Sequence, residues 1–174
     1  RESNPNIDYD KAQSLVDLAY KNGVNYFDTA YMYHCGKSEA FIGYALKKYP
    51  RDTYYLADKL PIWMCDTKED MKRVFDEQLE RTGMDYFDFY LLHSLDNENF
   101  EKCEKFDAYD FLKKMQKEGK IKYIGFSFHG TVDDLRNVVS AHKWDFAQIQ
   151  MNYLDWENQN AKMQYQILED SGIP

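Results

Sequence analysis

Glycine is scarce in this sequence, and the positions of the few glycines exclude two common nucleotide-binding loops. The 174 residues contain 8 glycines, and no two of them form a G-x-G pair. The dinucleotide fingerprint of an open doubly wound sheet and the phosphate-binding P-loop both require closely spaced glycines. Proteins that depend on either loop are therefore excluded.

Positive charge and long hydrophobic runs are also lacking. The chain has 22 Lys+Arg against 30 Asp+Glu, a formal net charge of −8. Nucleic acids and anionic membranes both bind basic surfaces, so we expect neither as a partner. No apolar run approaches the ~18 residues of a membrane span, and the chain opens on polar residues from Arg1 to Asn6. These features predict no membrane anchor and no secretory signal in the given chain.

Cysteine is rare and widely spaced. Cys35, Cys65 and Cys103 form no C-x-x-C pair, so the sequence contains neither a disulfide framework nor a zinc ribbon. We interpret them as ordinary thiols of a cytoplasmic protein, and we predict no metal site.

The sequence alternates between strand-like and helix-period segments along its whole length. Strands are predicted at residues 24–28, 53–58, 86–92, 121–127 and 146–151. Helices are expected before, between and after them, and this alternation is typical of βαβ units and a parallel sheet. No linker or shift in composition divides the chain, so residues 1–174 are predicted to form one α/β domain. An open sheet and a (β/α)8 barrel both fit the alternation. The glycine-rich turn of open-sheet dinucleotide binders is missing, and the residues at the strand ends favour the barrel.

Local signals mark several helix ends. Asp8 and Ser38 are expected to cap the first two helices, and Asp66 or Thr67 the third, which Gly83 should end. The acidic stretch from Asp96 to Glu104 is interpreted as solvated surface.

Each predicted strand ends near a polar residue that can take part in chemistry. In chain order these residues are Asp28, Lys59, His93, Ser127, and Gln148 or Gln150. The strands of a parallel barrel all end at the same face, so these side chains should converge on one mouth. Tyr33, five residues after Asp28, lies on the first of the loops at that mouth.

Together these groups suit proton donation to a carbonyl. An ordinary tyrosine, with a pKa of about 10, donates a proton poorly near neutral pH. A Lys59 ammonium beside the Tyr33 hydroxyl would favour the phenolate and make the tyrosine a stronger acid. Asp28 would hold the ammonium, and a neutral His93 could orient a carbonyl oxygen by hydrogen bonding.

Each of these residues also has a structural explanation when taken alone. Asp28 fits a turn, Lys59 a solvated strand end, and His93 a buried structural histidine, and Tyr33 is one of 15 tyrosines. The right residue at three successive strand ends and on one loop is much harder to explain by chance.

Residues that follow other strand ends are more ambiguous. Trp63, Met64 and His129 could line a substrate pocket or pack under an aromatic-rich rim, and the sequence leaves both readings open.

Several segments resemble the aldo-keto reductase superfamily. They occur in the family's order and are Gly23–Tyr33, Gly36–Gly43, Asp58–Leu60, Asp85–His93 and Gly119–Ser127. The resemblance extends from about residue 8 to residue 174, almost the whole chain.

The resemblance implies an oxidoreductase on a (β/α)8 TIM barrel that reduces an aldehyde or ketone to an alcohol. It implies NADP(H), or alternatively NAD(H), bound across the barrel mouth, with Tyr33 as the general acid. The positions that match the family's catalytic four are Asp28, Tyr33, Lys59 and His93. Ser127 and Gln148 match positions that bind the nicotinamide carboxamide. Phe128 stands where the family usually has Asn, so the contact there should be altered.

The residues around Tyr33 and Ser127 resemble those of a bacterial branch of the family that often carries a 4Fe-4S cluster domain after the barrel. The cysteines of such a cluster would lie beyond Pro174, outside this chain.

The length suggests an excerpt of a longer protein. A complete barrel of this type needs ~250 residues, whereas five strands, numbers 2 to 6 by resemblance, are predicted here. Strand 1 would precede Arg1, strands 7 and 8 would follow Pro174, and the chain has no initiator Met. We therefore expect a partial barrel that is inactive by itself.

Two other functions remain as alternatives. A nicotinamide-binding regulatory or sensor subunit could use the same fold without turnover, although no residue of the catalytic four is missing. A metal-dependent barrel isomerase or hydrolase would gather several His, Asp or Glu ligands at the strand ends. The cationic Lys59 between Asp28 and His93 disfavours this metal site.

Overall fold

Five parallel strands form one sheet whose spatial order follows the chain, β1-β2-β3-β4-β5. The computed structural model describes residues 6–158 and 160–174. The strands are β1 (Tyr26–Asp28), β2 (Tyr55–Leu60), β3 (Phe87–Leu95), β4 (Ile121–Phe128) and β5 (Phe146–Ile149). The helices are α1 (Tyr9–Lys21), α2 (Ser38–Leu46), α3 (Lys68–Thr82), α4 (Asn97–Lys105), α5 (Ala108–Lys117), α6 (Val132–Ala141), α7 (Asp155–Asn158) and α8 (Ala161–Asp170). Short 3-10 turns occur at η1 (Arg51–Thr53) and η2 (Ile62–Met64).

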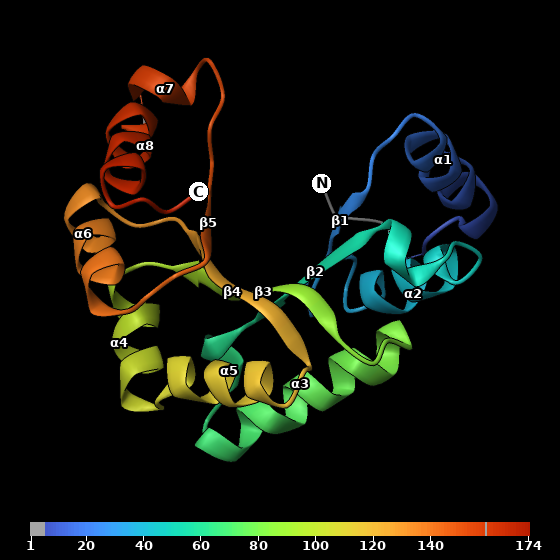
Figure 1. Ribbon diagram of the computed structural model, residues 1–174, viewed down its shortest axis with the longest axis horizontal. Helices are drawn as coiled ribbons and strands as arrows, with labels where there is room; N and C mark the ends of the chain where they lie inside the picture. The colour runs from blue at the N-terminus through green and yellow to red at the C-terminus, as the bar shows by residue number, and fades with distance from the viewer. Residues whose placement is uncertain (1–5, 159) are drawn as a thin grey trace.

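The sheet is curled into a half-barrel, with α3 and α5 packed along its outer face (Figure 1). The core lies between the strands and these helices, where Phe75 of α3 meets Phe87 and Tyr90 of β3. In Figure 1 the drawn helices lie around the opposite, concave face of the sheet rather than across it. Five parallel strands with their helices confirm the predicted partial barrel.

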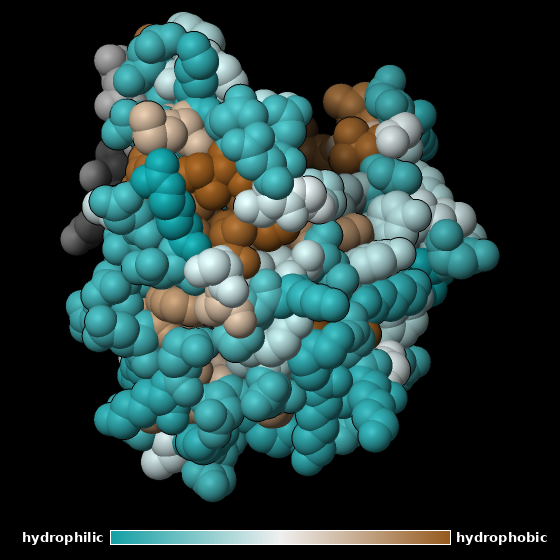
Figure 2. Space-filling view, turned by 60° about the vertical axis from the view of Figure 1, so that its left-hand side comes forward, coloured by the Kyte–Doolittle hydropathy of each residue, from teal (hydrophilic) through white to brown (hydrophobic). Residues whose placement is uncertain are grey.

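Side chains on the concave face form an aromatic layer below the carboxyl ends of the strands. Phe89 lies at its centre, with ring centroids 5.3 Å from Tyr26, 5.0 Å from Tyr123 and 5.0 Å from Phe146. Side chains alternate faces with a period of two along a strand, so His93, four residues after Phe89, and Ser127, four residues after Tyr123, also face inward. Phe87, at the start of β3, is the exception and packs against α3. Figure 2 shows other hydrophobic residues, in brown, exposed in a hollow between hydrophilic parts of the surface.

Helices α2 and α3 approach each other very closely at Gly43. A Cβ atom added to Gly43 would lie 2.1 Å from the backbone oxygen of Thr82, so only glycine allows this contact. One helical turn earlier, Glu39 of α2 faces Gln78 of α3, and their side chains are hydrogen-bonded. The crossing therefore sets which polar groups meet behind the sheet.

The predicted helix ends are mostly confirmed. The Asp8 carboxylate accepts a hydrogen bond from the backbone N–H of Lys11, as expected of an N-cap. Thr67 caps α3 in a capping box with Asp70, and Gly83 ends the helix at φ 65°.

The prediction for Ser38 is wrong. Lys37 occupies the N-cap position of α2 without a side-chain bond, and Ser38 is the first residue of the helix. The Ser38 hydroxyl oxygen instead accepts a hydrogen bond from the Thr29 hydroxyl, 2.9 Å away, so it is engaged in holding the loop that precedes α2.

Two segments have structure that the sequence did not predict. The acidic side chains of Glu98, Glu101 and Glu104 are exposed, as expected, but their stretch forms helix α4, which Asp96 caps and which buries Cys103 against the core. Strand β3 continues past His93 to Leu95 with a register shift, and Ser94 there has a φ of 55°. In the part of the chain that the structure describes, no helix is long and apolar enough to cross a membrane.

Candidate active site

The buried ammonium of Lys59 lies at the centre of the site. Its Nζ atom lies 2.5 Å from Asp28 Oδ1 and 2.8 Å from the backbone oxygen of Thr29. It also lies 3.5 Å from the Tyr33 hydroxyl. The Lys59 side chain is only 2% exposed, and a buried ammonium is costly unless each of its protons has a partner. The three oxygens provide those partners and place Asp28, Lys59 and Tyr33 in one cluster.

Tyr33 lies on the loop between β1 and α2. After it, His34 and Cys35 adopt left-handed backbone conformations with φ of 49° and 54°, which turn the chain back toward α2. The Lys59 ammonium lies 4.9 Å from the centre of the Tyr33 ring, while the tyrosine as a whole is 39% exposed. The hydroxyl is therefore held by a buried charge and remains open to a ligand.

His93 lies on the other side of Tyr33. The two rings meet edge to face with centroids 5.9 Å apart, and the Trp63 ring lies 5.0 Å from His93. Burial lowers the pKa of His93 to about 4, and the positive charge of Lys59 acts in the same direction. The imidazole is therefore neutral at neutral pH. Its buried Nδ1 has no hydrogen-bond partner within the described structure.

A cavity of about 210 Å³ opens over these groups. Its lining includes Tyr33, Lys59, His93, Ser127, His129 and Gln148. The Ser127 oxygen accepts a hydrogen bond of 2.7 Å from the backbone N–H of Ser94, which leaves the serine proton available to a ligand. The structure therefore brings the predicted strand-end residues to one mouth. Asp28 does not line the cavity itself, but it contacts Lys59, which does.

The residues that the sequence left ambiguous divide into two groups. His129 and Gln150 line the cavity, whereas Trp63 and Met64 are outside its lining, and the Trp63 ring packs against His93. Phe128 is 1% exposed and packs edge-on to Phe126 in the core, so it does not reach the cavity. The side chain at the position that carries Asn in the resembled family therefore points into the core here, away from the cavity.

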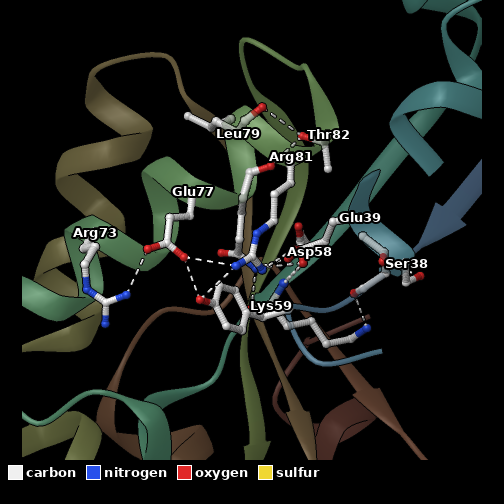
Figure 3. A network of polar contacts seen from close by, with 12 residues as sticks. Ser38, Glu39, Asp58, Lys59, Arg73, Glu77, Leu79, Arg81 and Thr82 are labelled. Carbon is white, nitrogen blue, oxygen red and sulfur yellow. Dashed lines mark hydrogen bonds and ion pairs between the residues drawn. The ribbon is translucent and has the colours of Figure 1, made fainter. Parts of the chain in front are cut away.

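Sequence reasoning missed the polar cluster behind Lys59 (Figure 3). Glu39, Asp58 and Gln78 are completely buried there. Burial, together with the negative charge of Glu39, raises the pKa of Asp58 well above its ordinary value. The only sequence signal was polar Asp58 next to Lys59 in an otherwise apolar strand, and α/β periodicity alone does not indicate its partners.

The structure also bears on metal binding. Within residues 6–158 and 160–174, no group of three or more His, Cys, Asp or Glu is placed to hold a metal ion.

The chain is similar in sequence to known oxidoreductases. An aldo-keto reductase of Gibberella moniliformis is 31% identical over 149 residues, which cover 82% of this chain and 44% of that protein. The NADH-specific methylglyoxal reductase of Escherichia coli is 27% identical over 177 residues, covering 89% of this chain and 52% of that protein. The glyoxal reductase of Bacillus subtilis is 32% identical over 120 residues, covering 67% of this chain and 40% of that protein. The chain thus spans about half the length, or less, of these relatives.

Solved structures agree on the fold. The holo form of an aldo-keto reductase from Bacillus halodurans matches with a TM-score of 0.74 and 26% identity, over 97% of this chain and 55% of that one. An aldo-keto reductase from Klebsiella pneumoniae in complex with NADPH matches with a TM-score of 0.74 and 24% identity, over 95% of this chain and 56% of that one. The sequence model of the Aldo/keto reductase family matches residues 2–174, and the chain belongs to that family.

Proposed function

We propose that the whole protein is a nicotinamide-dependent carbonyl reductase that converts an aldehyde or ketone to an alcohol. The observation that carries this proposal is the Lys59 ammonium, which contacts both the Asp28 carboxylate and the Tyr33 hydroxyl at the mouth of a small cavity. Similarity to a methylglyoxal reductase and a glyoxal reductase supports a small reactive aldehyde as the substrate.

Tyr33 is the proposed general acid. Its hydroxyl faces the cavity and would donate its proton to the substrate oxygen as the carbonyl becomes an alkoxide. Lys59 stabilises the phenolate that remains, since a positive charge beside an oxygen anion lowers its free energy in a site with little water. Asp28 holds the lysine in place.

His93 is the proposed orienting group. A neutral imidazole presents one N–H donor, and the low pKa of about 4 keeps His93 in this form at neutral pH. Its ring lines the cavity beside Tyr33, so both side chains can hydrogen-bond one carbonyl oxygen.

Ser127 and Gln148 would hold the carboxamide of NADP(H) or NAD(H). A free serine proton and a side-chain amide match the acceptor and donor of a carboxamide, and both residues line the cavity. When bound, the nicotinamide supplies the hydride for carbonyl reduction. We propose NADP(H) as the cofactor, and comparing NADPH with NADH by fluorescence quenching in the full-length protein tests this choice.

Two further expectations stay predictions. We propose a cytoplasmic location, with Cys35, Cys65 and Cys103 free as they are in the structure. A 4Fe-4S cluster would lie outside residues 1–174.

Substitution of the general acid tests the function. In the full-length protein with NADPH and methylglyoxal, we expect Tyr33→Phe to lower kcat by about 10² to 10⁴, the usual contribution of general acid catalysis. Nucleotide affinity should stay unchanged, because the ring is retained. Tyr44→Phe, on the exposed outer side of α2, is the control and should keep full activity.

Undiminished turnover in Tyr33→Phe would refute the mechanism. Nucleotide binding without turnover in the wild-type protein would instead favour the sensor alternative, and turnover that needs an added metal but no nucleotide would favour the hydrolase or isomerase alternative.

A further inference from the structure

A buried glutamine fixes the backbone of Lys59 from behind the sheet. The Gln78 side-chain nitrogen lies 2.9 Å from the backbone oxygen of Lys59, 2.9 Å from Asp58 Oδ1 and 3.0 Å from Glu39 Oε1. The Gln78 oxygen accepts a hydrogen bond from the buried Tyr90 hydroxyl, which determines which end of the amide faces Lys59. Buried polar atoms of this kind are costly to leave unpaired, so the amide has one favoured orientation. Helix α3 is thereby attached to the strand residue whose side chain enters the site.

Arg81, three residues later on the same helix, is attached to the loop of the proposed general acid. Its guanidinium donates to the Tyr31 hydroxyl at 3.1 Å and lies 4.1 Å from the centre of the Tyr31 ring. Tyr31 in turn donates to Glu77 of α3 at 2.6 Å. Because Tyr31 is two residues before Tyr33, these contacts connect the Tyr33 loop to α3.

The same guanidinium also reaches helix α2. Arg81 Nη1 lies 3.0 Å from Glu39 Oε2, and Glu39 is completely buried. Glu39 thus joins Arg81 to Gln78, so the contacts behind the Tyr33 loop and those behind Lys59 form one network (Figure 3). A buried carboxylate without a cationic partner would be strongly unfavourable, which makes Arg81 the charge on which the network depends.

We propose that Arg81 is a positioning residue, which sets the placement of the Tyr33 hydroxyl relative to the Lys59 ammonium through Tyr31 on one side and Glu39 and Gln78 on the other. This inference rests on the proposed carbonyl reduction by Tyr33. The two reacting groups are 3.5 Å apart and lie on separate elements, so their spacing depends on what holds the loop to the sheet. Misplacement of a catalytic group by about 1 Å can cost up to 10²-fold in rate.

Arg73 provides a matched control. It also binds Glu77, with Nη1 3.0 Å from Oε1, but it contacts neither Tyr31 nor Glu39 in the described structure. Arg73 binds Oε1 of Glu77, whereas the Tyr31 hydroxyl and Arg81 bind Oε2. Removing Arg73 therefore takes a cation from the same carboxylate and leaves both direct contacts of Tyr31 in place.

The test uses the full-length protein with NADPH and methylglyoxal and compares Tyr31→Phe, Arg81→Gln and Arg73→Gln. We expect kcat to fall about tenfold in the first two variants, while KM and the Kd for NADPH stay within about twofold of wild type. Arg73→Gln should keep all three constants within about twofold. Hydrogen exchange should become faster at residues 29–37 in the first two variants only.

Wild-type kcat in Tyr31→Phe, or an equal loss in Arg73→Gln, would overturn the proposal. If Arg81→Gln does not fold, Tyr31→Phe decides, because it keeps the ring beside Arg81 and removes only the hydroxyl. Absence of turnover in the wild type would count against the proposed function. In that case hydrogen exchange still tests whether Tyr31 holds the Tyr33 loop. Unchanged exchange at residues 29–37 in Tyr31→Phe would refute the proposal.

Discussion

At the scale of single residues, His93 is the group whose charge state the site controls most clearly. Its side chain is buried beside the Lys59 ammonium, and a second positive charge there would be repelled and poorly solvated. The imidazole therefore stays neutral at neutral pH. The same two causes that prepare His93 for hydrogen bonding make its protonation unfavourable to the fold.

This argument predicts a pH-dependent stability. The pKa of His93 is lowered from 6.5 to about 4 on folding, so between these values the unfolded chain binds the proton more readily. The folded state should therefore lose stability as the pH falls from about 6.5 toward 4, by about 1 to 2 kcal/mol at pH 5. Urea unfolding at pH 7 and pH 5 measures this change, which should be smaller by that amount in His93→Gln. An equal change in the two proteins would show that His93 is not its source.

At the scale of elements, the crossing of α2 and α3 determines whether the buried network can form. Gly43 lets the backbones touch at Thr82, and Glu39 and Gln78 lie one turn earlier on the two helices. Helix α2 follows the Tyr33 loop directly, so a shift of α2 would move the loop as well. The absence of a Cβ atom at Gly43 therefore affects the position of the Tyr33 loop, although Gly43 lies in a helix outside the sheet.

Gly43→Ala tests this crossing. The added Cβ would lie 2.1 Å from the Thr82 oxygen, so the helices must separate, and we expect a loss of about 2 to 3 kcal/mol in unfolding free energy. Gly83→Ala is the control. Nothing lies within 4 Å of its added Cβ, and only the left-handed φ of 65° should cost about 1 kcal/mol. Urea denaturation compares the two, and a loss in Gly43→Ala no larger than in Gly83→Ala would contradict the close approach.

At the scale of the whole molecule, the half-barrel carries exposed aromatic groups on its concave side. Tyr26, Tyr55 and Tyr123 are each about 40% exposed. In the described sheet β1 pairs only with β2, while on the outer edge of β5 the Ala147 N–H donates a hydrogen bond to the Pro174 oxygen. Apolar surface and unpaired strand edges of this kind favour association.

The 174-residue chain expressed alone should therefore self-associate. We expect its apparent mass in light scattering to rise with concentration and a hydrophobic dye to bind it. Tyr55→Lys and Tyr123→Lys should weaken both effects, because they place charge on the concave face, whereas Tyr153→Lys, at an 88% exposed position outside the strands, should change neither. A monomer at all concentrations would refute the expectation.

The strand-end residues show how far the sequence alone could go. Asp28, Lys59, His93, Ser127 and Gln148 were predicted to converge because parallel strands end at one face, and the structure places them around one cavity, Asp28 through Lys59. Ser38 shows a limit of local reasoning. Its hydroxyl suits an N-cap, but a hydrogen bond from Thr29, nine residues away, engages it instead.

The sequence by itself determined the alternation of elements, the parallel sheet and the residues at the mouth, because these follow from local periodicity and from strand direction. Only the tertiary structure decided the network behind Lys59. Arg81 meets Tyr31 and Glu39 across 50 and 42 residues of sequence, and Gln78 meets Asp58 across 20. Such contacts depend on how closely two helices pack, and that distance is set at Gly43 by a contact between backbones that no local pattern encodes.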